Sequence, residues 1–168
     1  MTGKTHIACG VFIGTHYAVS HAYNISQFAA IIGTSALFSI VPDICHAGSK
    51  IGRKIWPVSA LIRVLFGHRT VTHSILFMLL VSTVLYLLQV RNVYIISANL
   101  GIISHLILDM MTPSGVTLFF PWTKKIRFPF KIKTGGVIDH SLATAFSLVT
   151  MYIVYNEIIH RTISWIKY

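Results

Sequence analysis

Apolar residues occur in five long runs, separated by short segments in which Pro, Gly and charged residues collect. Each run is close to the ~17 to 25 residues that an α-helix needs to cross the hydrocarbon core of a bilayer. The pattern predicts an all-α membrane protein with about five transmembrane helices, over residues 7–23, 25–41, 74–90, 93–111 and 141–159. No internal repeat or flexible linker interrupts this pattern, so residues 1–168 are expected to form a single domain.

The composition agrees with a membrane protein, because 54% of the residues are hydrophobic and only 11% are charged. A soluble domain usually carries about 25% charged residues. The formal net charge of +10 would suggest nucleic-acid binding in a soluble chain, but here anionic lipid headgroups are the favoured partner and nucleic acid is not. Two cysteines in different contexts exclude a disulfide framework, and nothing in the sequence predicts the oligomeric state.

Positive charge is distributed unevenly among the segments between the runs. Eleven of the fourteen Lys and Arg residues lie in the N-terminal tail and in the segments 42–73 and 112–140, which two crossings separate from one another. Because cytoplasmic loops carry the excess of Lys and Arg, we expect these three segments in the cytoplasm and the C-terminus outside. The expected location is the bacterial cytoplasmic membrane, as a multi-pass protein.

Histidines and three of the four acidic residues lie near the predicted cytoplasmic ends of the runs. Up-and-down helices would bring these ends together around one cavity. Buried polar side chains near a membrane are costly unless they are paired or bind an ion. The residues expected to converge are His6, Asp43, His46, His68, His73, His105, Asp109, Asp139 and His140.

His105 and Asp109 give the strongest single signal, because residues four apart lie on one face of a helix. Such a pair can bind one ion, or it can be a structural His–Asp pair; the surplus of histidines favours metal. Imidazole and carboxylate ligands suit Zn²⁺ first, with Mn²⁺ or Fe²⁺ as alternatives. His16, His21 and His160 lie toward the other ends of their runs; for His16 and His21 an interhelical hydrogen bond is favoured over metal binding.

Five sequence motifs together resemble the YdjM-type inner-membrane proteins, described as metal-dependent hydrolases. The motifs lie within residues 3–140: an early KTH, PDICHAGS, GHRTVTHS, SHLILDMMTPSG followed by FFPW, and RFPFKIKTGG before an acidic residue. Cys45 stands where the family usually has a second aspartate, which bears on the number of ions or on the metal preference. The H-x-x-x-D pattern is also similar to that of zinc-dependent phospholipase C and single-strand nucleases.

These observations together predict a metal-dependent hydrolase that acts on a phosphoester of a membrane lipid at the cytoplasmic face. Asp139 would be a ligand or general base, and Arg69 would neutralise charge on the phosphate. The expected metal ligands are His6, Asp43, His46, His68, His73, His105 and Asp109.

Two further segments have predicted structures of their own. Residues 50–67 read as an interfacial amphipathic segment, and residues 117–133 as a short extended or hairpin structure at headgroup level.

A metal or proton transporter and a non-enzymatic membrane regulator are the alternative functions. A transporter would place its polar residues near the middle of the bilayer, and a regulator would not need nine histidines.

Overall fold

The computed structural model describes residues 1–45 and 71–166, and for residues 44–45 and 160–166 the backbone alone. These residues form five α-helices and one short 3-10 helix, so the predicted all-α class is confirmed. In chain order the elements are α1 (Gly3–His21), α2 (Ile25–Phe38), η1 (Val41–Cys45), α5 (Ile75–Leu87), α6 (Asn92–Met110) and α7 (Val137–Ile166).

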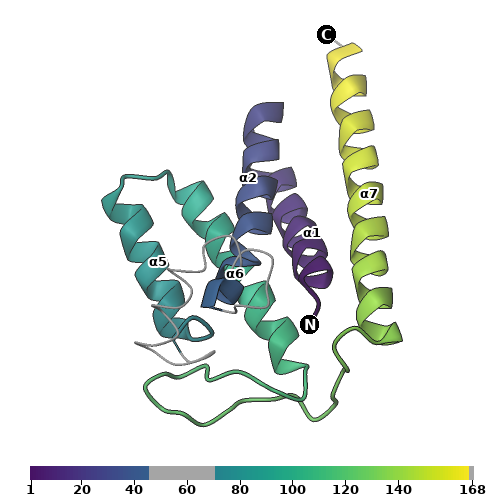
Figure 1. Ribbon diagram of the computed structural model, residues 1–168. Coiled ribbons are helices and arrows are strands. Elements are labelled where there is room, and N and C mark those ends of the chain that lie inside the picture. The colour runs from purple at the N-terminus through teal and green to yellow at the C-terminus, as the bar shows by residue number, and fades with distance from the viewer. Residues whose placement is uncertain (46–70, 167–168) are drawn as a thin grey trace.

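Helix α1 is the centre of the bundle, since it contacts α2, α6 and α7 (Figure 1). Among the described elements, α7 packs on α1 alone and α5 packs on α6 alone. The two termini lie at opposite ends of the bundle (Figure 1). The N-terminus, η1 and the loop that joins α6 to α7 share one end, which we call the site end.

Three helical segments are long and apolar enough to cross a membrane: Ile25–Asp43, Asn92–Met110 and Val137–Ile159. Helix α5 is apolar, but its 13 residues span about 20 Å, less than the roughly 30 Å of a hydrocarbon core. Helix α1 has 19 residues but carries Lys4 and three histidines. The helical bundle is therefore as predicted, whereas five full crossings remain a prediction.

Small residues allow α1, α2 and α6 to approach closely. A Cβ added at Gly10 would lie 2.5 Å from Cβ of Ser39, and one added at Gly101 would lie 2.3 Å from the backbone oxygen of Ser35. The hydroxyl of Ser35 donates a hydrogen bond to the backbone oxygen of Gly10, at 2.8 Å. Close backbone packing with serine hydrogen bonds is typical of helices that associate in membranes. It brings the N-terminal part of α1 and the C-terminal part of α6 to the same place.

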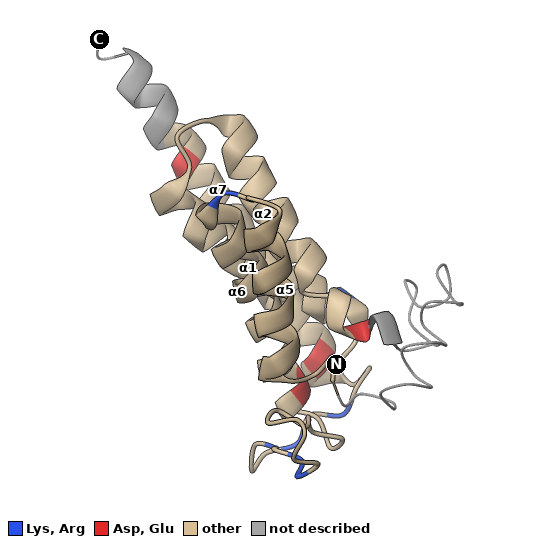
Figure 2. Cartoon of the chain, turned by 90° about the vertical axis from the view of Figure 1, so that its left-hand side faces the viewer, with Lys and Arg blue, Asp and Glu red and all other residues tan. Residues whose placement is uncertain are grey.

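Among the described residues, the loop between α6 and α7 carries most of the positive charge at the site end (Figure 2). Val116 and Ile126 exchange two backbone hydrogen bonds, of 3.1 and 2.8 Å, as an isolated antiparallel bridge. The extended conformation predicted for residues 117–133 is therefore present around this bridge, and the described residues contain no strand.

Candidate metal centre

Four buried or half-buried side chains from three separate parts of the chain point at one place. Asp43 is in η1, directly after α2, and His73 precedes Ser74, which caps the start of α5. His105 and Asp109 occupy the last turns of α6. Their ligand atoms lie within 4.8 Å of one another, and we call the set the metal cluster: Asp43, His73, His105 and Asp109.

The distances within the metal cluster suit a single ion. Nε2 of His73 lies 3.2 Å from Nε2 of His105, 3.4 Å from Oδ2 of Asp109 and 3.6 Å from Oδ1 of Asp43. Nε2 of His105 lies 3.7 Å from Oδ2 of Asp109 and 4.0 Å from Oδ1 of Asp43. Four ligands at tetrahedral corners around Zn²⁺ would be about 3.3 Å apart, given metal–ligand bonds of about 2.0 to 2.1 Å. The five observed separations range from 3.2 to 4.0 Å, so the shortest ones match this value and the others are longer.

Hydrogen bonds outside the cluster orient both imidazoles. Nδ1 of His105 donates to the backbone oxygen of Ser39, at 2.8 Å. A carbonyl only accepts, so the neutral ring carries its lone pair on Nε2, which faces the cluster. Nδ1 of His73 forms a hydrogen bond with Oγ1 of Thr72, at 3.1 Å. Histidines that ligate metals almost always use their second nitrogen in this way.

Charge also favours a divalent cation at the cluster. The side chains of His73 and His105 are fully buried, that of Asp109 is 2% exposed, and that of Asp43 is 15% exposed. Two carboxylates and two neutral imidazoles carry a double negative charge, which suits a divalent ion, while the ammonium of Met1 pairs with the oxygen of Asp109 that faces away from the cluster. The donor set therefore fits a divalent transition metal, and Asp43 marks the side of the cluster that is open to its surroundings.

His6 lies against the metal cluster without being one of its four members. Its ring stacks on that of His105 with centroids 4.0 Å apart, and its Nε2 is 3.2 Å from Oδ1 of Asp109. The amino group of Met1 lies 2.5 Å from the same oxygen. Asp109 thus directs one oxygen to the cluster and the other to α1. Among the described residues, Nδ1 of the buried His6 has no hydrogen-bond partner.

Asp139 is fully buried, but it binds the start of α1 and not the cluster. Its Oδ2 accepts from the backbone N–H groups of Thr2, at 3.0 Å, and of Gly135, at 2.8 Å. Its Oδ1 accepts from the hydroxyl of Thr5. The carboxylate joins the first turn of α7 to the first turn of α1, and thereby fixes the helix that carries His6.

The remaining predicted site residues, His46, His68 and Arg69, lie outside the described residues, as does the segment 50–67. Cys45 ends η1, and its side chain lies outside the described residues.

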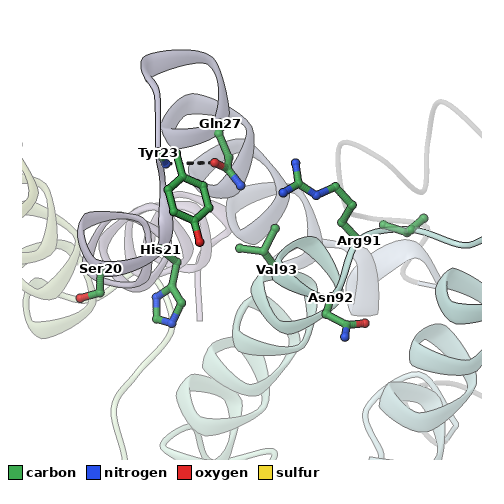
Figure 3. Close-up of a pocket in the computed structure, with 8 residues that line it drawn as sticks. Ser20, His21, Tyr23, Gln27, Arg91, Asn92 and Val93 are labelled. Atoms are coloured by element: carbon green, nitrogen blue, oxygen red, sulfur yellow. Dashed lines mark hydrogen bonds between the residues drawn. The ribbon is translucent and has the colours of Figure 1, made fainter.

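Two of the histidines predicted to lie away from the site, His16 and His21, do so, and the side chain of His160 lies outside the described residues. His16 is exposed on α1, and Nδ1 of His21 donates to the backbone oxygen of Tyr17 within the same helix, at 2.9 Å. The predicted interhelical bond for His21 is therefore wrong. His21 borders an open pocket of about 530 Å³ at the end of the bundle opposite the cluster, where Arg91 and Gln27 also lie (Figure 3). That pocket has no carboxylate in its lining and does not resemble a cation site.

Sequence reasoning did not find the groups that orient the cluster. Ser39 acts through its backbone oxygen, which no side-chain pattern marks. The one signal that the sequence offers is a threonine directly before a histidine, as Thr72 stands before His73 and Thr5 before His6.

The sequence as a whole identifies the protein family. The chain matches the YdjM inner membrane protein family over residues 1–165. It belongs to that family. The predicted resemblance is therefore confirmed, and with three apolar spans it locates the chain in the bacterial inner membrane.

Two relatives match over nearly their whole lengths. The chain is 40% identical to the uncharacterized protein YvsG of Bacillus subtilis over 161 residues, which are 92% of this chain and 95% of the relative. It is 27% identical to the inner membrane protein YdjM of Escherichia coli over 176 aligned positions, covering 98% of this chain and 89% of the relative. No solved structure matches this chain.

Proposed function

We propose that this chain is a membrane-bound, metal-dependent hydrolase that acts on a phosphoester of a lipid at the cytoplasmic face. The observation that carries the proposal is the convergence of two imidazoles and two carboxylates within 4.8 Å, at one end of a helical bundle. Zn²⁺ is the favoured ion, with Mn²⁺ or Fe²⁺ as alternatives.

Four protein ligands are compatible with catalysis if the ion has five or six ligands in all. A tetrahedral ion with four protein ligands is closed, whereas mixed nitrogen and oxygen ligands also suit octahedral ions, which retain positions for water and substrate. A divalent metal at this place would activate a bound water and polarise a phosphoryl oxygen. The partly exposed Asp43 indicates the side from which a substrate would approach.

The chain's own residues then have separable roles. Ser39 and Thr72 hold the two imidazoles with Nε2 toward the ion, and Asp139 positions α1. In the reaction, the water oxygen would form a bond to phosphorus, the phosphorus–oxygen ester bond would break, and the leaving oxygen would take a proton. Arg69 would neutralise the charge that develops on the phosphoryl oxygens.

The location of the metal cluster favours a hydrolase over a transporter. His105 and Asp109 end α6, and His73 precedes α5, so the cluster lies at helix ends. A transport site is expected near the middle of the bilayer, on interrupted helices. Headgroups meet water at the membrane boundary, so helix ends are the right depth for chemistry on a lipid phosphoester.

The test is hydrolysis by the full-length chain in nanodiscs, with a panel of phospholipids and product analysis by mass spectrometry. We expect turnover that stops when a chelator removes the metal and returns when the metal is restored. His105→Ala should abolish it, and His16→Ala, at an exposed position on α1, should not. A protein that keeps its metal but hydrolyses no lipid phosphoester would overturn the proposal.

A further inference from the structure

An apolar groove of about 360 Å³ lies between α5 and the loop that follows α6. It is within the size range of roughly 300 to 1,000 Å³ that is typical of ligand pockets. The backbone N–H of Ile75 donates to the oxygen of Leu118, at 2.9 Å, and fixes the loop against the start of the helix. We call it the α5 groove; its lining is Ile75, Leu76, Leu79, Leu118, Phe119, Phe120, Pro121 and Trp122.

The α5 groove begins beside the metal cluster. Ile75 follows His73 by two residues, so their Cα atoms are at most about 7 Å apart. Leu76 and Leu79 are 38% and 54% exposed, on a helix that packs only on α6 among the described elements. The groove is therefore open sideways, toward the hydrocarbon region that surrounds an apolar helix.

The loop that lines the α5 groove also carries positive charge. Residues 117–133 contain five Lys and Arg residues and no acid. Lys124 and Lys125 follow Trp122 by two and three residues, and all three are exposed. An exposed Trp beside lysines is typical of the boundary between hydrocarbon and headgroups. An anionic lipid would place its acyl chain against an apolar lining, its phosphate beside cations and its phosphoester bond near the metal cluster. The α5 groove and its surroundings offer all three features.

We propose that the α5 groove binds one acyl chain of an anionic phospholipid, with Lys124 and Lys125 holding its phosphate beside the metal cluster. The inference rests on the proposed function in that this lipid is the substrate. It goes further by naming the lipid class and the residues that select it. Lateral opening lets the lipid enter from the bilayer without leaving it.

The test uses Trp122 as a reporter, in a full-length chain where Trp56→Phe and Trp165→Phe remove the other two tryptophans. The protein is placed in vesicles in which a minor lipid has brominated acyl chains, which quench nearby tryptophan. We expect brominated phosphatidylglycerol to quench Trp122 more than the same fraction of brominated phosphatidylcholine. Lys124→Gln and Lys125→Gln should each lower this preference by about fivefold, since a lysine near an anionic surface contributes about 1 kcal/mol.

Matched variants separate a site from a general attraction to the membrane. Lys131→Gln and Lys133→Gln each remove the same charge farther along the loop, and each should leave the preference largely intact. Leu79→Phe fills the groove and should reduce quenching, whereas Leu87→Phe, at a 72% exposed position on the same helix, should not. Equal quenching by the two lipids, or equal losses in both lysine pairs, would overturn the inference.

The same measurement on metal-stripped protein keeps this inference distinct from the proposed function. Selective quenching in both the metal-stripped and the metal-loaded protein, without turnover in the metal-loaded protein, would uphold the lipid site and refute the hydrolase. Turnover without selective quenching would uphold the hydrolase and refute the lipid site.

Discussion

Gly101 is the position at which one added methyl group should disturb the metal cluster from a distance. A Cβ there would lie 2.3 Å from the backbone oxygen of Ser35, 3.0 Å from the nitrogen of Ser39 and 3.1 Å from the carbonyl carbon of Phe38. All three are backbone atoms of α2 and its end, so no side-chain rotation can relieve the clash. Carbon and oxygen approach to about 3.3 Å in favourable contacts. Gly101→Ala should therefore push α6 away from α2 by about 1 Å.

Such a displacement should move His105 of the metal cluster away from Ser39. His105 follows Gly101 by four residues on the same helix face, and its Nδ1 donates to the oxygen of Ser39. Overpacking of this kind typically costs about 1 to 3 kcal/mol of stability. Loss of the hydrogen bond that orients a metal ligand typically lowers metal affinity by about 10- to 100-fold. We therefore expect Gly101→Ala to lower both the thermal midpoint and the metal affinity.

Gly33→Ala is the matched control, because an added Cβ at Gly33 of α2 meets nothing within 4 Å. It should leave metal affinity unchanged and keep or raise the midpoint, since Ala is the better helix former. The assay is metal competition against a chelator of known affinity, with thermal unfolding of the same detergent-purified samples. If Gly101→Ala binds metal as tightly as the wild type, α2–α6 packing does not position His105.

Three further outcomes are expected. Reporter fusions should place the N-terminus in the cytoplasm and the C-terminus outside; a cytoplasmic C-terminus would mean that one predicted run does not cross. Thr72→Val removes the hydroxyl that contacts Nδ1 of His73 and should weaken metal binding by about 10- to 100-fold in the same chelator assay, whereas Thr83→Val, at an exposed site on α5, should not. Thr5→Val leaves the buried Asp139 carboxylate one hydrogen-bond donor short. It should lower the free energy of unfolding by about 1 to 3 kcal/mol while the metal stays bound. If Asp139→Asn instead loses turnover at unchanged stability, Asp139 is a catalytic base.

The sequence was sufficient to predict the helices and the core of the site, because both depend on spacing along the chain. The i,i+4 spacing of His105 and Asp109 places both on one helix face, and up-and-down topology brings Asp43 and His73 to the same end. Helix ends were less predictable. The run predicted over 141–159 extends to Val137–Ile166, since Asp139 before it and His160 and Arg161 after it do not stop a helix. Helix α5 ends at Leu87, before the left-handed Gln89 with φ of 56°.

The rest of the site depends on how the helices meet, which hydropathy does not encode. His6 and Asp139 were expected beside the ion, yet His6 stacks on His105 and Asp139 binds Thr2 and Thr5. Where His6 and Asp139 lie relative to the four-residue group depends on how α1 packs against α6 and on where the first turn of α7 meets α1. The backbone oxygen of Ser39 enters the site only because small residues bring α2 within reach of α6.

Binding of a divalent ion to the metal cluster, through Asp43, His73, His105 and Asp109, is the expectation on which the proposed function depends. Its most direct test is elemental analysis of the purified full-length protein, combined with X-ray absorption at the edge of the metal found. We predict a bound transition metal with imidazole and carboxylate ligands at about 2.0 to 2.2 Å, which His105→Ala and Asp109→Ala remove and His16→Ala retains. Equal metal content in the wild type and all three variants would contradict the account.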